Sequence, residues 1–358
     1  MNTWRTTRVS QRLGLDVPII QGPFGGGLSS VNLAACVSEA GGLGSFGVHH
    51  LTAPDISKVA AAIRAQTQKP FALNLWLPFD QSDAQPSPVQ YQEYLQPLLP
   101  YYTELGLPVP EQPQHFSPDF DEQMHAVLEA RPKVFSFVYG VPPTWVIEQC
   151  KSLGIMTLGA ATTPDEARAL EAGGVDMVVA TGFEAGGHRV SFLRKPEESL
   201  MGTFSLIPQV VDAVRIPVVA AGGIADGRGI AAALTLGADA VQIGTAFLAC
   251  VESGTSQLHR NKILSNEAKY TGLTRAFSGR LARGIQNRFM NDLRDSALAP
   301  YPIQNWLTGK LKLAATEQAR AELMSLWCGQ SAPLLKHTEA QVLLTSLIQQ
   351  TDQIYLGK

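Results

Sequence analysis

The chain has 358 residues, of which 45% are hydrophobic and 16% are charged, and its formal net charge is −3. This much apolar sequence can fill a large α/β core, and the length suits one barrel domain with an added subdomain. No block of lysines and arginines is present, which argues against nucleic acid or an anionic membrane as a partner. No run approaches the ~18 apolar residues of a membrane span, and the N-terminus has no apolar signal region, so we expect a cytoplasmic protein.

Short apolar, β-branched runs alternate with longer helical patterns, which favours βαβ units and a parallel sheet. The predicted strands cover residues 17–21, 42–46, 71–77, 133–139, 155–160, 177–182, 217–223 and 240–247. Capping residues mark the helices between them: one begins at Ser29 or Ser30 and ends near Gly41, and another has Thr163 as N-cap and Pro164 in its first turn. Eight repeats without a clear break favour closure, so we predict a (β/α)8 TIM barrel rather than a doubly wound sheet.

Two segments interrupt the barrel pattern. Residues 78–118 are rich in proline and predict a long insertion after the third strand. Beyond Leu248 the strand pattern is lost, and the sequence indicates helices with more charge. We therefore expect a barrel over 1–250 that includes the insertion, a smaller helical subdomain over 251–325 that covers the active site, and C-terminal helices over 326–358 that return to the barrel.

The stretch GLGSFG, from Gly42 to Gly47, matches the G-x-G-x-x-G motif of dinucleotide-binding proteins only in its letters. That motif must follow a strand, open a helix and precede an acidic residue by ~20 positions. Here a helix precedes the motif, the motif is itself a predicted strand, and Thr67 and Lys69 stand where the acid would be needed. We interpret these glycines as residues that allow close packing of a helix on a strand.

Glycines also end the last two predicted strands. Gly222 and Gly223 follow the seventh strand, and Gly244 and Thr245 lie at the end of the eighth. In a TIM barrel these two loops and a nearby helix N-terminus form the usual phosphate site, and glycine lets backbone N–H groups approach phosphate oxygens. The sequence therefore favours phosphate binding here over two ordinary strand ends.

Asn74 places an amide inside the apolar third strand, FALNLWL. A buried amide must find hydrogen-bond partners. The pattern leaves two interpretations open: a satisfied core amide, or an amide that faces a heterocycle rich in donors and acceptors.

His188 is the candidate catalytic residue, because it follows the sixth strand within the glycine-rich stretch GFEAGGHR. The pKa of an unperturbed histidine is near 6.5, which suits proton abstraction at neutral pH. The His49-His50 pair also follows a strand, but adjacent histidines point apart and chelate poorly, so we interpret the pair as loop residues. The four cysteines form no Cys-x-x-Cys pair, and no metal or hydrolase signature is present, so we expect reduced thiols and no metal site.

Taken together, PIIQGPFGGG, EAGGLGSFG, NLWLP, GFEAGGHR, AAGGIADGRG, QIGTAFL and FSGRLARGIQNRF resemble the nitronate monooxygenase family, formerly called 2-nitropropane dioxygenases. The resemblance covers most of the chain. It implies an FMN-dependent TIM barrel in which His188 is the catalytic histidine and faces the flavin. The residues expected to bind FMN are Gly22, Pro23, Phe24, Asn74, Thr181, Gly186, Gly187, Gly222, Gly223, Gln242, Gly244 and Thr245.

The resemblance implies oxidation of alkyl nitronates or nitroalkanes by molecular oxygen, with a carbonyl compound and nitrite as products, by a monomer or homodimer. Two positions depart from the family: Phe24 stands where methionine is common, and Thr181 where glutamine is common. Related barrels with the same loop reduce quinones or enoyl-acyl-carrier-protein substrates with NAD(P)H, so that activity is the alternative. A third interpretation, from the phosphate pattern alone, is a barrel that binds or isomerises a sugar phosphate.

Overall fold

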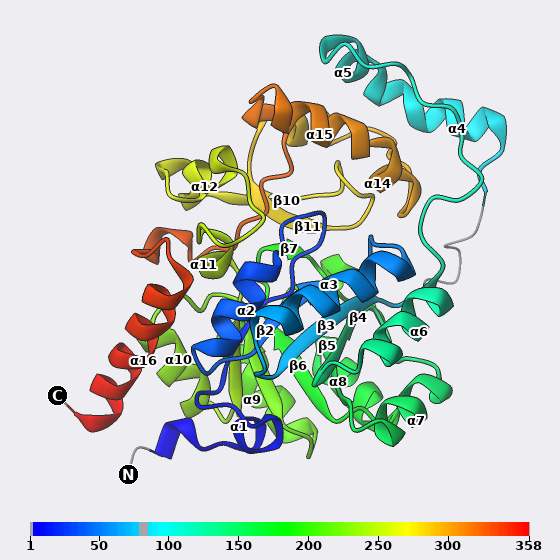
Figure 1. The fold of residues 1–358 in the computed structure, drawn as a ribbon. Coiled ribbons are helices and arrows are strands. Elements are labelled where there is room, and N and C mark those ends of the chain that lie inside the picture. The colour runs from blue at the N-terminus through cyan, green and yellow to red at the C-terminus, as the bar shows by residue number, and fades with distance from the viewer. Residues whose placement is uncertain (1–2, 79–84, 358) are drawn as a thin grey trace.

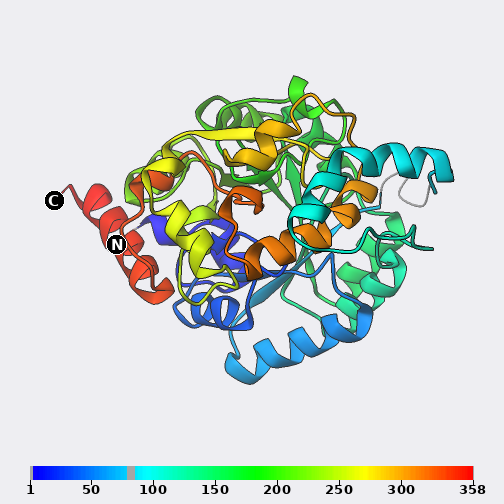
Figure 2. The same cartoon turned by 90° about the horizontal axis from the view of Figure 1, so that it is seen from above.

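The structure is a computed structural model that describes residues 3–78 and 85–357. Eight parallel strands form one sheet that closes on itself. Helices surround this sheet, as Figures 1 and 2 show. They are β1 (Ile19–Gln21), β2 (Gly44–Gly47), β3 (Phe71–Trp76), β4 (Val134–Val138), β5 (Met156–Ala161), β6 (Met177–Thr181), β8 (Val218–Ala221) and β9 (Ala240–Ile243). A parallel bridge between Ile20 and Leu43 joins the two ends of the sheet. The predicted (β/α)8 TIM barrel is confirmed.

Each strand leads, directly or through an insertion, to a helix on the outside of the barrel. These helices are α2 (Val31–Glu39), α3 (Ala53–Gln66), α6 (Phe120–Ala130), α7 (Thr144–Ser152), α8 (Pro164–Ala172), α9 (Thr203–Ala213), α10 (Gly227–Thr235) and α16 (Ala340–Leu356). The predicted caps are confirmed: Ser30 Oγ accepts from Leu33 N at 2.9 Å, and Thr163 Oγ1 accepts from Glu166 N at 3.2 Å.

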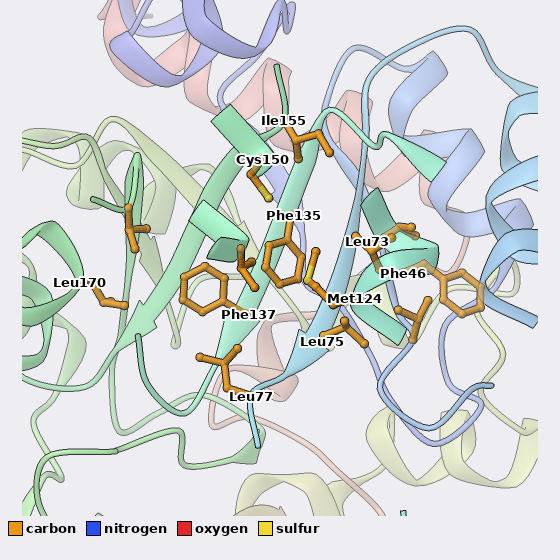
Figure 3. Packing of buried hydrophobic residues seen from close by; sticks show 14 of the residues in the cluster. Phe46, Leu73, Leu75, Leu77, Met124, Phe135, Phe137, Cys150, Ile155 and Leu170 are labelled. Atoms are coloured by element: carbon orange, nitrogen blue, oxygen red, sulfur yellow. The ribbon is translucent and has the colours of Figure 1, made fainter. Parts of the chain in front are cut away.

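The main core lies between the strands and these outer helices. Figure 3 shows Leu73 and Phe135, which point outward from β3 and β4, packed near Met124 of α6. Inside the barrel, α1 (Arg8–Leu13) closes the amino-terminal end with apolar side chains. Close packing also explains GLGSFG, because a Cβ at Gly44 would lie only 1.9 Å from the carbonyl oxygen of Ala34 in α2.

A second layer, which we call the cap, consists of residues 85–118 and 252–335 and lies over the carboxyl ends of the strands (Figure 1). Its elements are α4 (Pro88–Leu95), η2 (Gln96–Leu98), α5 (Leu99–Glu104), α12 (Gln257–Ile263), η4 (Asn266–Lys269), β10 (Thr271–Thr274), β11 (Ala282–Ile285), α13 (Arg288–Asp292), α14 (Ile303–Leu307), α15 (Gly309–Glu317), η5 (Ala321–Leu323) and η6 (Ala332–Leu334). Glu104 joins the two parts of the cap through ion pairs with Arg288 at 2.6 Å and with Arg320. Residues 79–84 of the predicted insertion lie outside the described residues.

Two local predictions were wrong. The expected eighth strand ends at Ile243, and Thr245–Leu248 form the short helix α11 because Gly244 leaves the extended conformation. Residues 251–325 are not purely helical: β10 and β11 form an antiparallel sheet with β7 (Gly187–His188). The partner that stabilises β11 lies far away in the sequence, so no local pattern indicates these strands.

The C-terminal helix α16 packs against α10 and α2 of the barrel. Among the described residues, no helix is long and apolar enough to cross a membrane. Cys150, Cys250 and Cys328 are buried thiols, and Cys36 is partly buried.

Candidate active site

The loop after β6 is held in place by buried polar groups on both sides. Arg189, which is 1% exposed, donates to the carbonyl oxygens of Gly182 at 2.7 Å and of Thr181 and Ser199 at 3.3 Å. Arg283 of β11 donates to the carbonyl oxygen of Phe183 at 3.0 Å. A buried guanidinium must be hydrogen-bonded, so these contacts fix the carbonyl groups of the loop as well as the arginines.

The glycines of this loop meet different needs. A Cβ at Gly186 would lie 2.5 Å from the backbone nitrogen of Gly329, so the loop and the end of the cap touch through backbone alone. Gly187 has a φ of +77° and open space around its Cα, and it pairs with Arg283 in the antiparallel sheet. One glycine therefore permits close approach, and the other permits a left-handed backbone.

Glu184 has a structural role in the same loop. Its carboxylate accepts hydrogen bonds from the backbone N of Thr203, at 2.8 and 3.0 Å, and from the Thr203 hydroxyl at 2.7 Å. Thr203 is the first residue of α9, so the carboxylate caps that helix and its charge interacts favourably with the helix dipole.

The loop positions His188 at the boundary between the barrel and the cap. Its Nε2 lies 2.8 Å from Ser278 Oγ, and its ring centroid lies 4.8 Å from that of Trp76 and 5.2 Å from that of Trp327. The Ser278 hydroxyl donates to the carbonyl oxygen of Arg280 at 3.3 Å, so its oxygen can accept from Nε2–H. In the tautomer that carries its proton on Nε2, the ring donates to Ser278 and Nδ1 keeps a lone pair that can accept a proton.

Burial lowers the pKa of His188 to about 3, with smaller contributions from the charges of Lys312 and Arg280. Removal from water disfavours the charged imidazolium, so the ring is neutral at pH 7. A neutral ring is the form that a proton acceptor requires, although its basicity is weak until an anion lies beside it.

Trp76 is the centre of an aromatic group next to His188. His49 stacks on its indole at 4.2 Å between centroids, while Tyr139 and Tyr301 approach at 5.0 and 5.2 Å. His49 is a loop residue, as predicted, and its ring belongs to the same group of side chains as His188. The sequence could have pointed to Trp76 as a site residue, because it lies two residues after Asn74 and its side chain is therefore on the same face of β3.

The glycines expected to bind phosphate follow β8 and β9. Gly222 and Gly223 have φ values of +99° and +73°. Gly244 has a φ of −99°, and a Cβ there would meet nothing closer than Phe24 Cε1 at 3.9 Å. Neither backbone conformation nor packing within the protein requires glycine at this position. The open space in front of Gly244 fits a ligand that approaches the backbone, as a phosphate cradle needs.

The remaining predicted residues line the same rim of the barrel. Gly22 N donates to Ile243 O at 2.8 Å, which brings the segment with Pro23 and Phe24 beside Gly244. Thr245 Oγ1 accepts from Gly329 N at 2.9 Å and keeps its own proton to donate. The other predicted residues are Asn74 in β3, Thr181 at the end of β6, Gly186 and Gly187 before His188, and Gln242 in β9.

Asn74 is 5% exposed and donates from Nδ2 to Ser136 Oγ in β4 at 3.0 Å. This contact satisfies part of the amide and fixes its orientation across two neighbouring strands. The hydrogen bond uses one N–H group and leaves the carbonyl oxygen of the amide available, so both interpretations of Asn74 remain compatible with the structure.

The cap contributes groups that sequence reasoning missed. Lys312 of α15 donates from Nζ to Asn305 Oδ1 at 2.9 Å, and Arg280 lies 3.9 Å above the Tyr139 ring. A cavity of about 510 Å³ extends between barrel and cap and is lined by Arg280, Tyr301 and Ser191, among others. Among the described residues, no group of three or more His, Cys, Asp or Glu side chains is placed to hold a metal ion.

The sequence matches the nitronate monooxygenase profile over residues 7–350. The chain belongs to the nitronate monooxygenase family. It is 38% identical to the probable nitronate monooxygenase of Staphylococcus aureus strain Newman over 354 residues, which are 98% of this chain and 99% of the relative. These findings make the chain an oxidoreductase of a flavoenzyme family.

Two solved structures show the same architecture. The nitroalkane oxidase of Streptomyces ansochromogenes has a TM-score of 0.88 and 36% identity, and the match covers 98% of this chain and 99% of that one. FabK from Thermotoga maritima has a TM-score of 0.75 and 29% identity, with 98% of both chains covered. The resemblance to nitronate monooxygenases is therefore confirmed at the level of family and fold.

Proposed function

We propose that this chain binds FMN and uses molecular oxygen to oxidise alkyl nitronates and nitroalkanes to carbonyl compounds and nitrite. Membership of the nitronate monooxygenase family and similarity to a nitroalkane oxidase support this reaction class. The single observation that carries the proposal is the position of His188. Its neutral ring contacts Ser278 through Nε2 and lies beside Trp76, at the same end of the barrel as the glycines after β8 and β9.

The glycines after β8 and β9 are suited to a flavin phosphate, because Gly244 has open space in front of it and Gly222 and Gly223 have a left-handed backbone. In this proposal those glycines and Thr245 hold the phosphate. The isoalloxazine ring contacts the other rim residues, namely Gly22, Pro23, Phe24, Asn74, Thr181, Gly186, Gly187 and Gln242. When bound, FMN supplies an acceptor for the electrons of the nitronate and passes them to oxygen.

His188 has two roles in the proposal. For a nitronate, which is already an anion, the ring binds and orients the nitro group. For a neutral nitroalkane, Nδ1 removes the α-proton. Proton transfer places a nitronate anion beside the new imidazolium, and an opposite charge within ~4–6 Å raises the pKa of a histidine. The ion pair therefore offsets the low basicity that burial gives the free ring.

NAD(P)H-dependent reduction of a quinone or an enoyl-acyl-carrier-protein substrate is the second candidate function. The structural similarity to FabK from Thermotoga maritima supports keeping it as a candidate. The two candidates share the cofactor and differ in which molecule reduces it.

Two assays separate these functions. The purified yellow protein is first mixed with an alkyl nitronate in air, and oxygen consumption and nitrite are measured. It is then mixed with NADH without oxygen, and loss of visible flavin absorbance is followed. We expect nitrite release with the nitronate and only slow bleaching by NADH. Rapid bleaching by NADH without nitrite release from the nitronate would assign the second function, and a colourless protein would leave the sugar-phosphate interpretation.

A further inference from the structure

The indole of Trp76 contacts two histidine rings at once. The His49 ring stacks on it, with centroids 4.2 Å apart and an angle of 12° between the planes. The His188 ring meets the same indole at 4.8 Å between centroids and at an angle of 73°. Any shift of the indole therefore changes the surface beside the candidate catalytic ring.

The backbone at His49 is fixed by helix α6. Gln123, which is 4% exposed, donates from Nε2 to the carbonyl oxygens of His49 at 3.0 Å and of Leu51 at 2.7 Å. A buried amide nitrogen that donates to two carbonyl groups has one orientation, and it holds the loop after β2 in place as well.

Gly25 provides the room that the His49 ring needs. A Cβ at Gly25 would lie 2.0 Å from His49 Cε1, so a larger residue would displace the ring. Ser29 Oγ accepts from the backbone N of Phe24 and from that of Gly47, each at 3.1 Å. These hydrogen bonds hold the segment that contains Gly25 against β2, so the space for the ring is set by rigid backbone.

The flat ring of His49, and not its Nδ1 atom, makes the contacts that hold the side chain. Nδ1 is buried and has no hydrogen-bond partner among the described residues. A buried nitrogen without a partner costs free energy, so this atom does not anchor the ring. The stacking on Trp76 and the fit to Gly25 are the contacts that remain.

His188 needs a fixed surface beside it, because one hydrogen bond leaves the plane of an imidazole free to tilt. Its Nε2 lies 2.8 Å from Ser278 Oγ, and rotation about the direction of that contact would swing Nδ1. The indole of Trp76, at 4.8 Å, and that of Trp327, at 5.2 Å between centroids, limit this rotation. The direction of Nδ1 thus depends on where the Trp76 indole lies.

We propose that His49 is a positioning residue: it fixes the Trp76 indole by stacking, and the indole fixes the plane of the His188 ring for proton transfer. The inference rests on the proposed function for the identity of the proton that His188 removes. Misplacement of a reacting group by ~1 Å can cost about a hundredfold in rate. The stack should therefore matter for deprotonation of a neutral nitroalkane and not for oxidation of a preformed nitronate.

The test compares His49→Ala, which removes the stacked ring, with His49→Phe, which keeps a flat ring of similar size. His50→Ala is the matched control, because His50 is exposed in the same loop. In His49→Ala, kcat on a neutral nitroalkane should fall about ten- to a hundredfold with little change in KM. The isotope effect of an α-deuterated nitroalkane should become larger, because proton removal is the slowed step. His49→Phe should recover most of the rate, and His50→Ala should not change it.

A second readout does not depend on turnover. In protein with isotope-labelled histidine, the Nε2–H group of His188 should give a proton resonance that His188→Asn removes. The ring currents of Trp76 shift that resonance, so it should move in His49→Ala and stay in place in His49→Phe and His50→Ala. If His49→Ala does not fold, His49→Leu fills the same space without a flat ring and should give the same changes.

An unmoved resonance in the variant without the ring would overturn the inference. Equal losses of rate on nitroalkane and nitronate would overturn it too, because a general loss of structure would then explain the effect. A moved resonance in a protein that oxidises no nitro compound would uphold the positioning role of His49 and reject the proposed function.

Discussion

The barrel and the cap present different chemical groups to the candidate active site. From the barrel come mostly backbone positions: the glycines after β6, β8 and β9, with Asn74 and Trp76 from β3. From the cap come side chains, among them Ser278, Arg280 and Tyr301. His188 belongs to the barrel sequence but is fixed by pairing with β11 of the cap. In the proposed function, the barrel holds the cofactor through backbone groups, and the cap contributes side chains around His188.

The largest effect should follow from placing a charge in the glycine rim of the barrel. Gly223→Asp should give a folded protein without flavin, because its carboxylate would face both the phosphate and Glu184, whose side chain lies 3.5–3.9 Å from a Cβ at this position. Gly223→Ala is the control, since it has the same strained φ of +73° but no charge. Visible absorbance of the purified proteins measures the flavin content. Full flavin content in Gly223→Asp would show that the phosphate binds somewhere else.

The junction of barrel and cap can be tested with two neighbouring glycines. Gly186→Ala should lower the free energy of unfolding by about 1–3 kcal/mol and weaken flavin binding, because its Cβ would push against the backbone at Gly329. Gly187→Ala meets open space and should cost only about 1–2 kcal/mol for its left-handed φ. Denaturant unfolding and flavin titration measure both effects. If Gly187→Ala lowered the free energy of unfolding more than Gly186→Ala, close approach to the cap would not be what Gly186 provides.

A smaller effect concerns acid sensitivity at the base of the cap. Burial lowers the pKa of His259, which is 2% exposed and bonded to the carbonyl oxygen of Trp327 at 3.0 Å, to about 4. The unfolded chain then binds more protons below pH 6.5, so stability should be constant above that pH and fall as the pH drops toward 4. Between pH 6.5 and 5 the loss is about 2 kcal/mol for this histidine. His259→Gln should remove that share of the pH dependence in unfolding experiments; an unchanged slope would contradict the assignment.

The barrel was predictable because its signals are local. Strand runs, Ser30 and Thr163 as caps, and glycines at strand ends each lie within a few residues of the structure that they specify. The cap was less predictable, because β11 is a strand only through its pairing with the distant β7, and Ser278 contacts His188 from 90 positions away in the sequence. His49 was dismissed because its neighbour is also histidine, although its complement, Gly25, lies in the glycine run after β1.

The central claim is that His188 acts at this junction as a proton acceptor, and the measurement that tests it most directly compares two substrates in His188→Asn. Asparagine keeps a polar side chain of similar reach, so flavin content should stay nearly intact. Turnover of a neutral nitroalkane should fall by about 10²–10⁴-fold, which is the usual cost of losing a positioned general base. Preformed nitronate needs no deprotonation and should lose much less. Equal losses on both substrates would mean that His188 mainly binds the anion, and unchanged rates on both would contradict the account.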